Sequence, residues 1–272
     1  MAKKIYVGVN GKARKVRKMY IGVIPQQFTL TDEAAAWERA SLAPTARKVK
    51  KGYIGVNGVA RLFFTSGKPL SQYAEGAIIK INEGGKPAEF YVAKHNYESS
   101  LNGNGRTLVV RKEAGVKKQF HSKTFDVQYS GSDIDNWLIN DYKNSLDAGV
   151  QSVLGSTKIK RTSTADRNDI LTDSRPVFLL SLRERGHTDS SANNYEGSPL
   201  PNISLYQQGY YNGAKDSIWT RTIHRTSDRY VFFINKYGTP EGNYPSSYLG
   251  VCPAFTLPET LLLNEQTNQI IG

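Results

Sequence analysis

A short basic phrase repeats near the N-terminus, and it constrains the fold of that region more than any other feature. Residues 3–14 read KKIYVGVNGKAR, and residues 50–61 read KKGYIGVNGVAR. Residues 17–23, RKMYIGV, begin a broken copy that residues 46–49 resume after an insertion at 24–45. A repeated phrase indicates a repeated structural unit. Such a unit suits an interaction module better than an active site, because chemistry rarely needs the same site several times.

Each complete copy predicts a small β-hairpin. Alternating residues lead into Asn10-Gly11 and Asn57-Gly58, and Asn-Gly accepts the positive φ angles of a type I′ turn. In the broken copy the insertion replaces the tip. It predicts a helix that Thr31 caps and Pro44 ends. This helix would present Trp37 either to a partner or to its own domain.

Basic charge is concentrated in the repeats. Residues 1–64 hold 13 of the 36 Lys and Arg residues but only 3 of the 24 Asp and Glu residues. Three uses fit such a basic face: docking onto an acidic protein surface, binding nucleic acid, or keeping an exposed sheet edge soluble. We adopt docking and do not expect nucleic acid as the partner. The predicted attachment residues are Lys15, Arg17, Lys18, Trp37, Arg47, Lys48, Lys50 and Lys51.

Several classes of protein are disfavoured. Cys252 is the single cysteine, so we expect neither a disulfide framework nor a cysteine-based zinc site. No stretch approaches the roughly 20 apolar residues of a membrane span, and the basic N-terminus lacks the apolar segment of a secretory signal. We therefore expect synthesis in a cytoplasm, release by another route such as lysis, and no membrane insertion.

No catalytic motif is recognisable, and we expect neither an enzyme nor a cofactor. The GxSxG, Walker A and HExxH patterns are absent. The histidines at 95, 121, 187 and 224 are scattered, and each fits a surface or hydrogen-bonded role. The pairs Asp133/Asp135 and Asp166/Asp169 could bind calcium, but helix capping and solvated loops explain them better, so no metal site is predicted.

The rest of the chain predicts an α+β fold with short strands and one or two helices. Ser66-Gly67-Lys68-Pro69 reads as a linker, which divides the chain into a module over 1–66 and a domain over 70–272. Ser132 and Asp135 form a capping box that opens a helix to about 146, and a second helix is expected over 149–154. We expect a hairpin over 75–97 that turns at 83–86, strands over 106–112, 175–183, 229–235 and 249–257, and a long loop over 186–217.

From about Tyr73 onward the motifs resemble a family known from phages. The carrying segments are GAIIKINEGGKPAEFYVAKH (76–95), NWLINDY (136–142), RPVFLLSLRE (175–184), WTRT (219–222), YVFFINKYG (230–238) and GVCPAFTLP (250–258). They resemble a domain of unknown function common in temperate phages and prophages of Gram-positive gut bacteria, which is usually encoded among tail genes and often follows such repeats. Where that family has Arg in GVRP, this chain has Cys252.

The resemblance implies both a fold and a function. The ending is similar to the C-type-lectin-like fold of phage receptor-binding proteins. It implies a virion protein of the tail tip, baseplate or fibre, which the repeats attach to other virion proteins and whose C-terminal domain binds a host cell-surface glycan or protein. It also implies a homo-oligomer. A structural alternative, a head decoration or tail accessory protein without a receptor, stays open, and a cell-wall-degrading enzyme is the least favoured.

Segments rich in Tyr, Ser and Asn flank the last two predicted strands. Tyr offers rigid amphipathic area, and Ser and Asn offer adaptable hydrogen bonds, as in antibody paratopes. The alternative is that these are ordinary polar loops. The residues predicted to bind the receptor are Tyr206, Tyr210, Tyr211, Asn212, His224, Arg225, Asp228, Tyr237, Asn243, Tyr244 and Tyr248.

Overall fold

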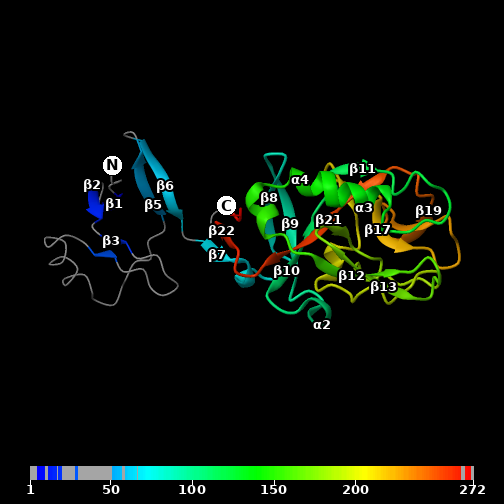
Figure 1. Cartoon of the computed structure of the whole chain (residues 1–272). Coiled ribbons are helices and arrows are strands. Elements are labelled where there is room, and N and C mark those ends of the chain that lie inside the picture. Colours follow the sequence, from blue (N-terminus) through cyan, green and yellow to red (C-terminus); the bar gives the residue numbers. More distant parts are fainter. Residues whose placement is uncertain are drawn as a thin grey trace. The chain divides into compact units, whose positions relative to one another are not determined.

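A computed structural model of the chain describes residues 67–264 and 267–270 in full and, before them, only the backbone of short strands (Figure 1). The chain divides into two compact units, residues 1–67 and 68–272. The strands of the first unit are β1 (Ile5–Val9), β2 (Lys12–Val16), β3 (Lys18–Met19), β4 (Phe28–Thr29), β5 (Lys51–Val56) and β6 (Val59–Thr65).

Both complete repeats form the hairpins that their sequences predict. β1 pairs with β2 as far as Val9 opposite Lys12, and β5 pairs with β6 as far as Val56 opposite Val59. Two residues, Asn-Gly, therefore separate the strands of each pair, which is the commonest hairpin connection. β3 also pairs with β4. Of the predicted attachment residues, Lys15, Lys18 and Lys51 lie on strands. Arg17, Arg47, Lys48, Lys50 and Trp37, with the helix predicted around it, lie outside the described residues.

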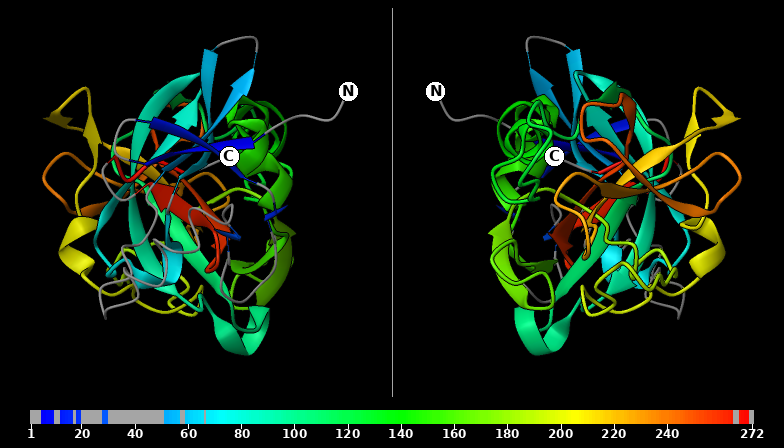
Figure 2. Two further views of the ribbon diagram at one scale, coloured as in Figure 1. Left: turned by 90° about the vertical axis from the view of Figure 1, so that its left-hand side faces the viewer. Right: turned by 90° about the vertical axis from the view of Figure 1, so that its right-hand side faces the viewer.

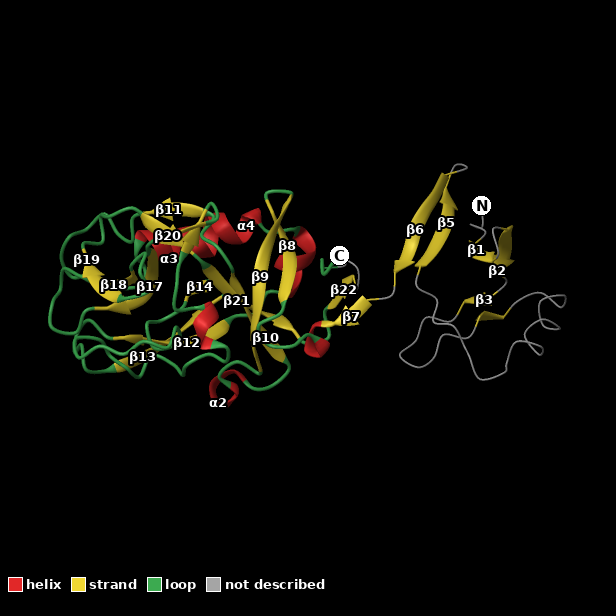
Figure 3. Cartoon of the chain, turned by 180° about the vertical axis from the view of Figure 1, so that it is seen from behind, coloured by secondary structure: helices red, strands yellow, loops and turns green. Residues whose placement is uncertain are grey.

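The second unit is built around two five-stranded sheets, seen from opposite sides in Figures 1 and 3. All pairs in them are antiparallel except β17 with β20. The first sheet has the order β14 (Phe178–Leu179), β21 (Pro253–Pro258), β10 (Arg106–Arg111), β9 (Lys86–His95) and β8 (Ile78–Glu83). The second has the order β11 (Val116–Lys118), β20 (Leu249–Val251), β17 (Ile218–Ile223), β18 (Val231–Ile234) and β19 (Pro240–Asn243).

Small strand pairs and short helices complete this unit, which is mixed α+β and mostly β. The pairs are β7 (Gly67–Pro69) with β22 (Leu262–Asn264), β12 (Thr157–Thr162) with β13 (Ile170–Arg175), and β15 (Tyr210–Tyr211) with β16 (Ala214–Lys215). The helices are η1 (Leu70–Gln72), α2 (Ser99–Asn102), α3 (Asp133–Trp137), η2 (Leu138–Tyr142), α4 (Lys143–Ser145), α5 (Ala148–Val153) and η3 (Ile203–Leu205). Within the described part of the chain, no helix is long and apolar enough to cross a membrane.

The predicted helix after Ser132 is confirmed as the continuous run α3–η2–α4, here called the helical run. The Ser132 hydroxyl accepts from the Asp135 amide at 3.2 Å, as a helix cap should. The Asp135 carboxylate reaches back to the Gly131 amide at 2.9 Å, one residue earlier than in a standard capping box. Ile134 and Leu138 are fully buried on the face that meets the sheets. The second predicted helix is α5.

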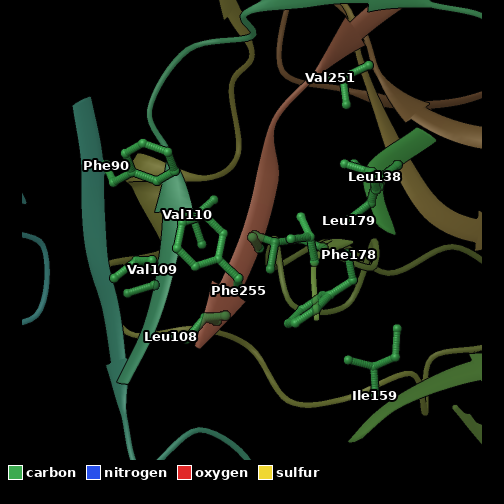
Figure 4. Packing of buried hydrophobic residues seen from close by; sticks show 14 of the residues in the cluster. Phe90, Leu108, Val109, Val110, Leu138, Ile159, Phe178, Leu179, Val251 and Phe255 are labelled. Atoms are coloured by element: carbon green, nitrogen blue, oxygen red, sulfur yellow. The ribbon is translucent and has the colours of Figure 1, made fainter. Parts of the chain in front are cut away.

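The hairpin predicted over 75–97 is confirmed as β8–β9, and the strand over 106–112 as β10. Gly84 and Gly85 both have positive φ angles, +56° and +77°, so the turn needs residues without a Cβ penalty. Phe90 of β9 packs edge-on against Phe255 of β21, with ring centroids 5.5 Å apart. Figure 4 shows these rings among the side chains of β10, Phe178 and Leu138 in the main core.

Two predicted strands are wrong in their extent. The strand over 249–257 is two strands, because the chain leaves the second sheet at Val251, passes through Cys252 and enters the first sheet at Pro253. The strand over 175–183 is reduced to β14. Pro176 has no N–H to donate after β13 ends, and beyond β14 the Ser181 amide bonds the Glu184 carboxylate at 2.9 Å instead of a neighbouring strand.

Candidate functional site

Aromatic side chains gather at the open end of the β18–β19 hairpin. The Tyr230 hydroxyl, just before β18, donates to the Tyr244 hydroxyl, just after β19, at 3.3 Å, and the ring centroids lie 5.0 Å apart. This hydrogen bond raises the pKa of Tyr230. His224 stacks on Phe232, with centroids 5.3 Å apart and planes 4° apart, and meets Tyr230 edge-on at 6.0 Å. We call His224, Tyr230, Phe232 and Tyr244 the tyrosine cluster.

Charged residues of the β17–β18 loop lie beside this cluster. The predicted residues Arg225 and Asp228 are exposed there. The Arg229 guanidinium lies 4.5 Å from the ring centroid of Phe125, which is 51% exposed. Burial lowers the pKa of His224, so the cluster favours a neutral imidazole. Tyr230 and Phe125 were not among the predicted residues, because Tyr230 falls in the predicted core strand 229–235 and Phe125 lies in a segment with no recognisable pattern.

Other predicted residues lie apart from the tyrosine cluster. Tyr237, 76% exposed, is in the turn that closes the β18–β19 hairpin, at the end opposite to Tyr244. Tyr248, 64% exposed, directly precedes β20. Asn243 is half-buried opposite Val231. The predicted set is therefore not one continuous patch, because the length of the hairpin separates its most exposed tyrosines.

The predicted residues near 210 divide further. Tyr206 is 1% exposed and packs edge-on against Tyr91 at 5.8 Å, so it is a core residue and its assignment to the recognition surface is wrong. Tyr210 and Tyr211 are half-buried on β15. Asn212 is exposed in the β15–β16 turn with a φ of +51°. Figure 2 shows this hairpin, in yellow, standing out from the edge of the domain.

A buried polar network holds the middle of the domain together. Arg221, fully buried on β17, forms two hydrogen bonds to the Glu184 carboxylate, at 2.6 and 2.9 Å. It also donates to the carbonyls of Lys160, Leu179 and Glu196. Burial alone would lower the pKa of Arg221, but the charge of Glu184 raises it.

A second carboxylate extends this network. Glu196 is fully buried and accepts from the Thr162 amide and hydroxyl, both at 2.5 Å, and from the Thr222 hydroxyl. Burial raises the pKa of Glu196, against the effect of Arg221 and these hydrogen bonds. Arg221 and Thr222 belong to the segment WTRT, and Glu184 ends RPVFLLSLRE. Arg221, Thr222 and Glu184 therefore stabilise the fold, because their polar atoms form hydrogen bonds within the buried network.

Cys252 is buried at the crossover between the sheets and is 2% exposed. Burial raises the pKa of its thiol, and the nearby Arg185 opposes that shift only in part. The Arg185 guanidinium, also 2% exposed, donates to the Tyr206 carbonyl at 2.9 Å. The thiol is therefore protonated and screened from solvent.

A pocket of about 270 Å³ lies where the two sheets part, and we call it the Trp137 pocket. Its walls come from the tip of β8–β9, the end of β10, the helical run and both sides of the crossover. In Figure 3 the helical run lies beside this hairpin tip, and the Gly84 amide donates to the Ser145 carbonyl at 2.7 Å. The side chains that matter most are Glu83, Arg111, Trp137 and Tyr142.

The polar groups of the Trp137 pocket are fixed by one another. Arg111 Nε donates to both carboxylate oxygens of Glu83, at 3.0 and 2.9 Å, and Nη1 donates to the Glu113 carbonyl. The Tyr142 hydroxyl donates to the same carboxylate. Burial together with the Glu83 charge raises the pKa of the Tyr142 hydroxyl. This pocket was not predicted, because its residues come from segments that are far apart in the chain and none of those segments alone indicates a cavity.

The aspartates that resembled calcium ligands have other partners. Asp133 accepts from the Ser122 amide at 2.8 Å and contacts His121 Nδ1 at 3.0 Å, and Asp135 pairs with Arg175. Asp166 accepts from the Asn168 amide at 2.9 Å in its own loop. Among the described residues, no three His, Cys, Asp or Glu side chains are grouped so that they could hold a metal ion.

The comparisons with known proteins identify a family but no function. No curated protein and no solved structure matches the chain. Residues 104–259 match the family model described as a domain of unknown function, DUF6273. The match begins just before β10 and ends just after β21, so it takes in the buried network, the tyrosine cluster and most of the Trp137 pocket. The chain is therefore a member of the DUF6273 family.

Proposed function

We propose that this protein is a phage virion component of the tail tip, baseplate or fibre that binds a receptor on the host cell surface. Its N-terminal hairpins attach it to other virion proteins, and residues 70–272 form the receptor-binding domain. The protein is then located in the virion and is a homo-oligomer. The receptor is a surface glycan or protein, and no catalysis is involved.

The tyrosine cluster is the observation that carries this proposal. Tyr244 is 46% exposed, and it is held in place by its contact with Tyr230. Exposed aromatic rings that are already ordered bind with little entropic cost. The neighbouring Arg225, Asp228 and Arg229 supply charged groups at the rim, where specificity is set.

The buried network supports binding over catalysis. Glu184, Glu196 and Arg221 are fully buried, as Asp135 is, and have no access to solvent. A catalytic role would require these charged groups to line a cleft that a substrate can enter. We further propose that the domain is C-type-lectin-like, a reading that its mixed, mostly β architecture supports.

Labelling intact particles with antibodies against residues 70–272 tests the assignment. We expect the label at the distal end of the tail. Adsorption of particles that carry Tyr244→Ala should fall by about fivefold or more, the effect of removing a hot-spot residue worth at least about 1 kcal/mol. The control is Tyr195→Ala, which removes a ring that is more accessible than Tyr244, 76% against 46% exposed, and lies outside the predicted set. Label on the head with unchanged adsorption would favour the decoration protein instead.

A further inference from the structure

The Trp137 pocket combines an open donor, a fixed acceptor and an aromatic ring. We propose that it binds a neutral polyhydroxylated ligand the size of one sugar ring. Its volume of about 270 Å³ is just below the roughly 300–1,000 Å³ of pockets for drug-sized ligands. A single ring fits this size better than a nucleotide or a peptide. The inference concerns a different surface from the tyrosine cluster and does not depend on the virion assignment.

The open donor belongs to Arg111. Its Nε and Nη1 are used by Glu83 and by the Glu113 carbonyl, whereas Nη2 has no hydrogen-bond partner among residues 67–264 and 267–270. The guanidinium lies flat over Gly115, where an added Cβ would be 2.9 Å from Cζ and 3.0 Å from Nη2. Glycine at 115 therefore lets the planar group lie in the pocket wall.

The acceptor is the Glu83 carboxylate next to it. A carboxylate offers about four lone-pair positions, and Glu83 uses some of them for Arg111 and Tyr142. An open N–H donor therefore sits beside an ionised acceptor, both held by other bonds. Adjacent hydroxyl groups on a sugar each donate and accept, so a vicinal diol matches this pair.

Trp137 provides the apolar surface. It is half-buried, and its ring centroid is 5.5 Å from that of Tyr142, while Val116, Val251 and Pro253 complete the apolar part of the lining. The C–H face of a sugar ring packs on an aromatic ring while its hydroxyls point to polar neighbours. The Lys118 ammonium lies 4.6 Å from the Trp137 centroid and covers part of the indole.

Charge selects a neutral ligand over an acidic one. Glu83 and Arg111 cancel each other, and their side chains are only 15% and 16% exposed. A ligand carboxylate bonded to Arg111 Nη2 would face the Glu83 carboxylate across a poorly solvated wall, which costs free energy. Neutral hydroxyls avoid this cost.

The test is calorimetric titration of the full-length protein with methyl glucoside, methyl galactoside and N-acetylglucosamine, and with glucuronate as the acidic counterpart. We expect at least one neutral sugar to bind with a Kd of about 1 mM, and glucuronate to bind at least about fivefold more weakly. Arg111→Lys, which keeps the charge but removes the planar donor, should weaken binding about tenfold. Trp137→Ala should have a similar effect.

Controls separate binding from folding. Lys112→Ala changes the residue next to Arg111, whose ammonium pairs with Glu89. Tyr195→Ala removes a distant exposed ring. Both variants should bind the sugars as the parent protein does. Melting temperatures show whether each variant folds, and Gly115→Ala is a further test that leaves the apolar lining intact. Absence of binding by all three neutral sugars, tighter binding of glucuronate, or full affinity in folded Arg111→Lys and Gly115→Ala would overturn the proposal.

Discussion

Replacing Arg221 with methionine is the sharpest test of the role we assign to the buried network. The change removes two hydrogen bonds to Glu184 and leaves a fully buried carboxylate with only the Tyr97 hydroxyl, at 2.5 Å, and the Ser181 amide as partners. Three carbonyls also lose a donor. Breaking a buried ion pair on one side costs about 3–5 kcal/mol.

The loss is large enough to read from thermal or urea unfolding. In a unit of about 200 residues, 1 kcal/mol corresponds to about 2–4 °C, so the melting temperature should fall by about 6–20 °C. The exposed Arg225→Met is the matched control and should change stability by no more than about 0.5 kcal/mol.

A double variant shows whether the two charges act together. Arg221→Met combined with Glu184→Leu should cost at least about 1 kcal/mol less than the sum of the single changes, because no charge is then left unpaired. Additive losses, or a loss below about 1 kcal/mol in Arg221→Met alone, would refute the argument that this pair organises the core.

Three other outcomes are expected. Burial raises the pKa of Glu196 above its usual 4.5, so the folded state holds the proton of Glu196 more tightly than the unfolded state does. The stability that Glu196 contributes is therefore full below pH 4.5 and is lost as pH rises through the folded pKa. Glu196→Gln should flatten this loss in pH-dependent unfolding, and an unchanged profile would contradict the shift. Cys252→Ala should cost about 1 kcal/mol or less, and the native thiol should react with a labelling reagent only after unfolding; rapid labelling of the native protein would contradict its burial. If the basic repeats dock onto an acidic surface, attachment to particles should weaken as salt rises, because the screening length is only about 10 Å at 0.1 M, and salt-independent attachment would point away from charge.

Local features were predictable where the sequence determines the backbone directly. Asn10-Gly11, Asn57-Gly58 and Gly84-Gly85 each lie between two strands that pair across them. Ser132 placed the start of the helical run for the same reason, since a capping side chain acts within a few residues.

Features that depend on long-range packing were not predictable. Val251, Cys252 and Pro253 form one apolar run, and only the assembled sheets decide that the chain changes sheet at Cys252. Tyr206 lies in the same polar, tyrosine-rich segment as Tyr210 and Tyr211, so the sequence does not distinguish it from them. In the structure Tyr91, more than a hundred residues away in sequence, packs against Tyr206 and helps to bury it. The Trp137 pocket likewise joins residues from eight helices and strands, and none of these elements alone indicates a cavity.

Binding of the purified, fluorescently labelled protein to host cells tests the central claim most directly. The parent protein and Tyr195→Ala should bind the cells and block adsorption of the phage at the same concentration. The Tyr244→Ala variant should block adsorption only at a concentration about fivefold or more above that of the parent protein, while its melting temperature stays unchanged. Failure of the parent protein to bind cells, or equal blocking by a folded Tyr244→Ala variant, would contradict recognition of the host through the tyrosine cluster.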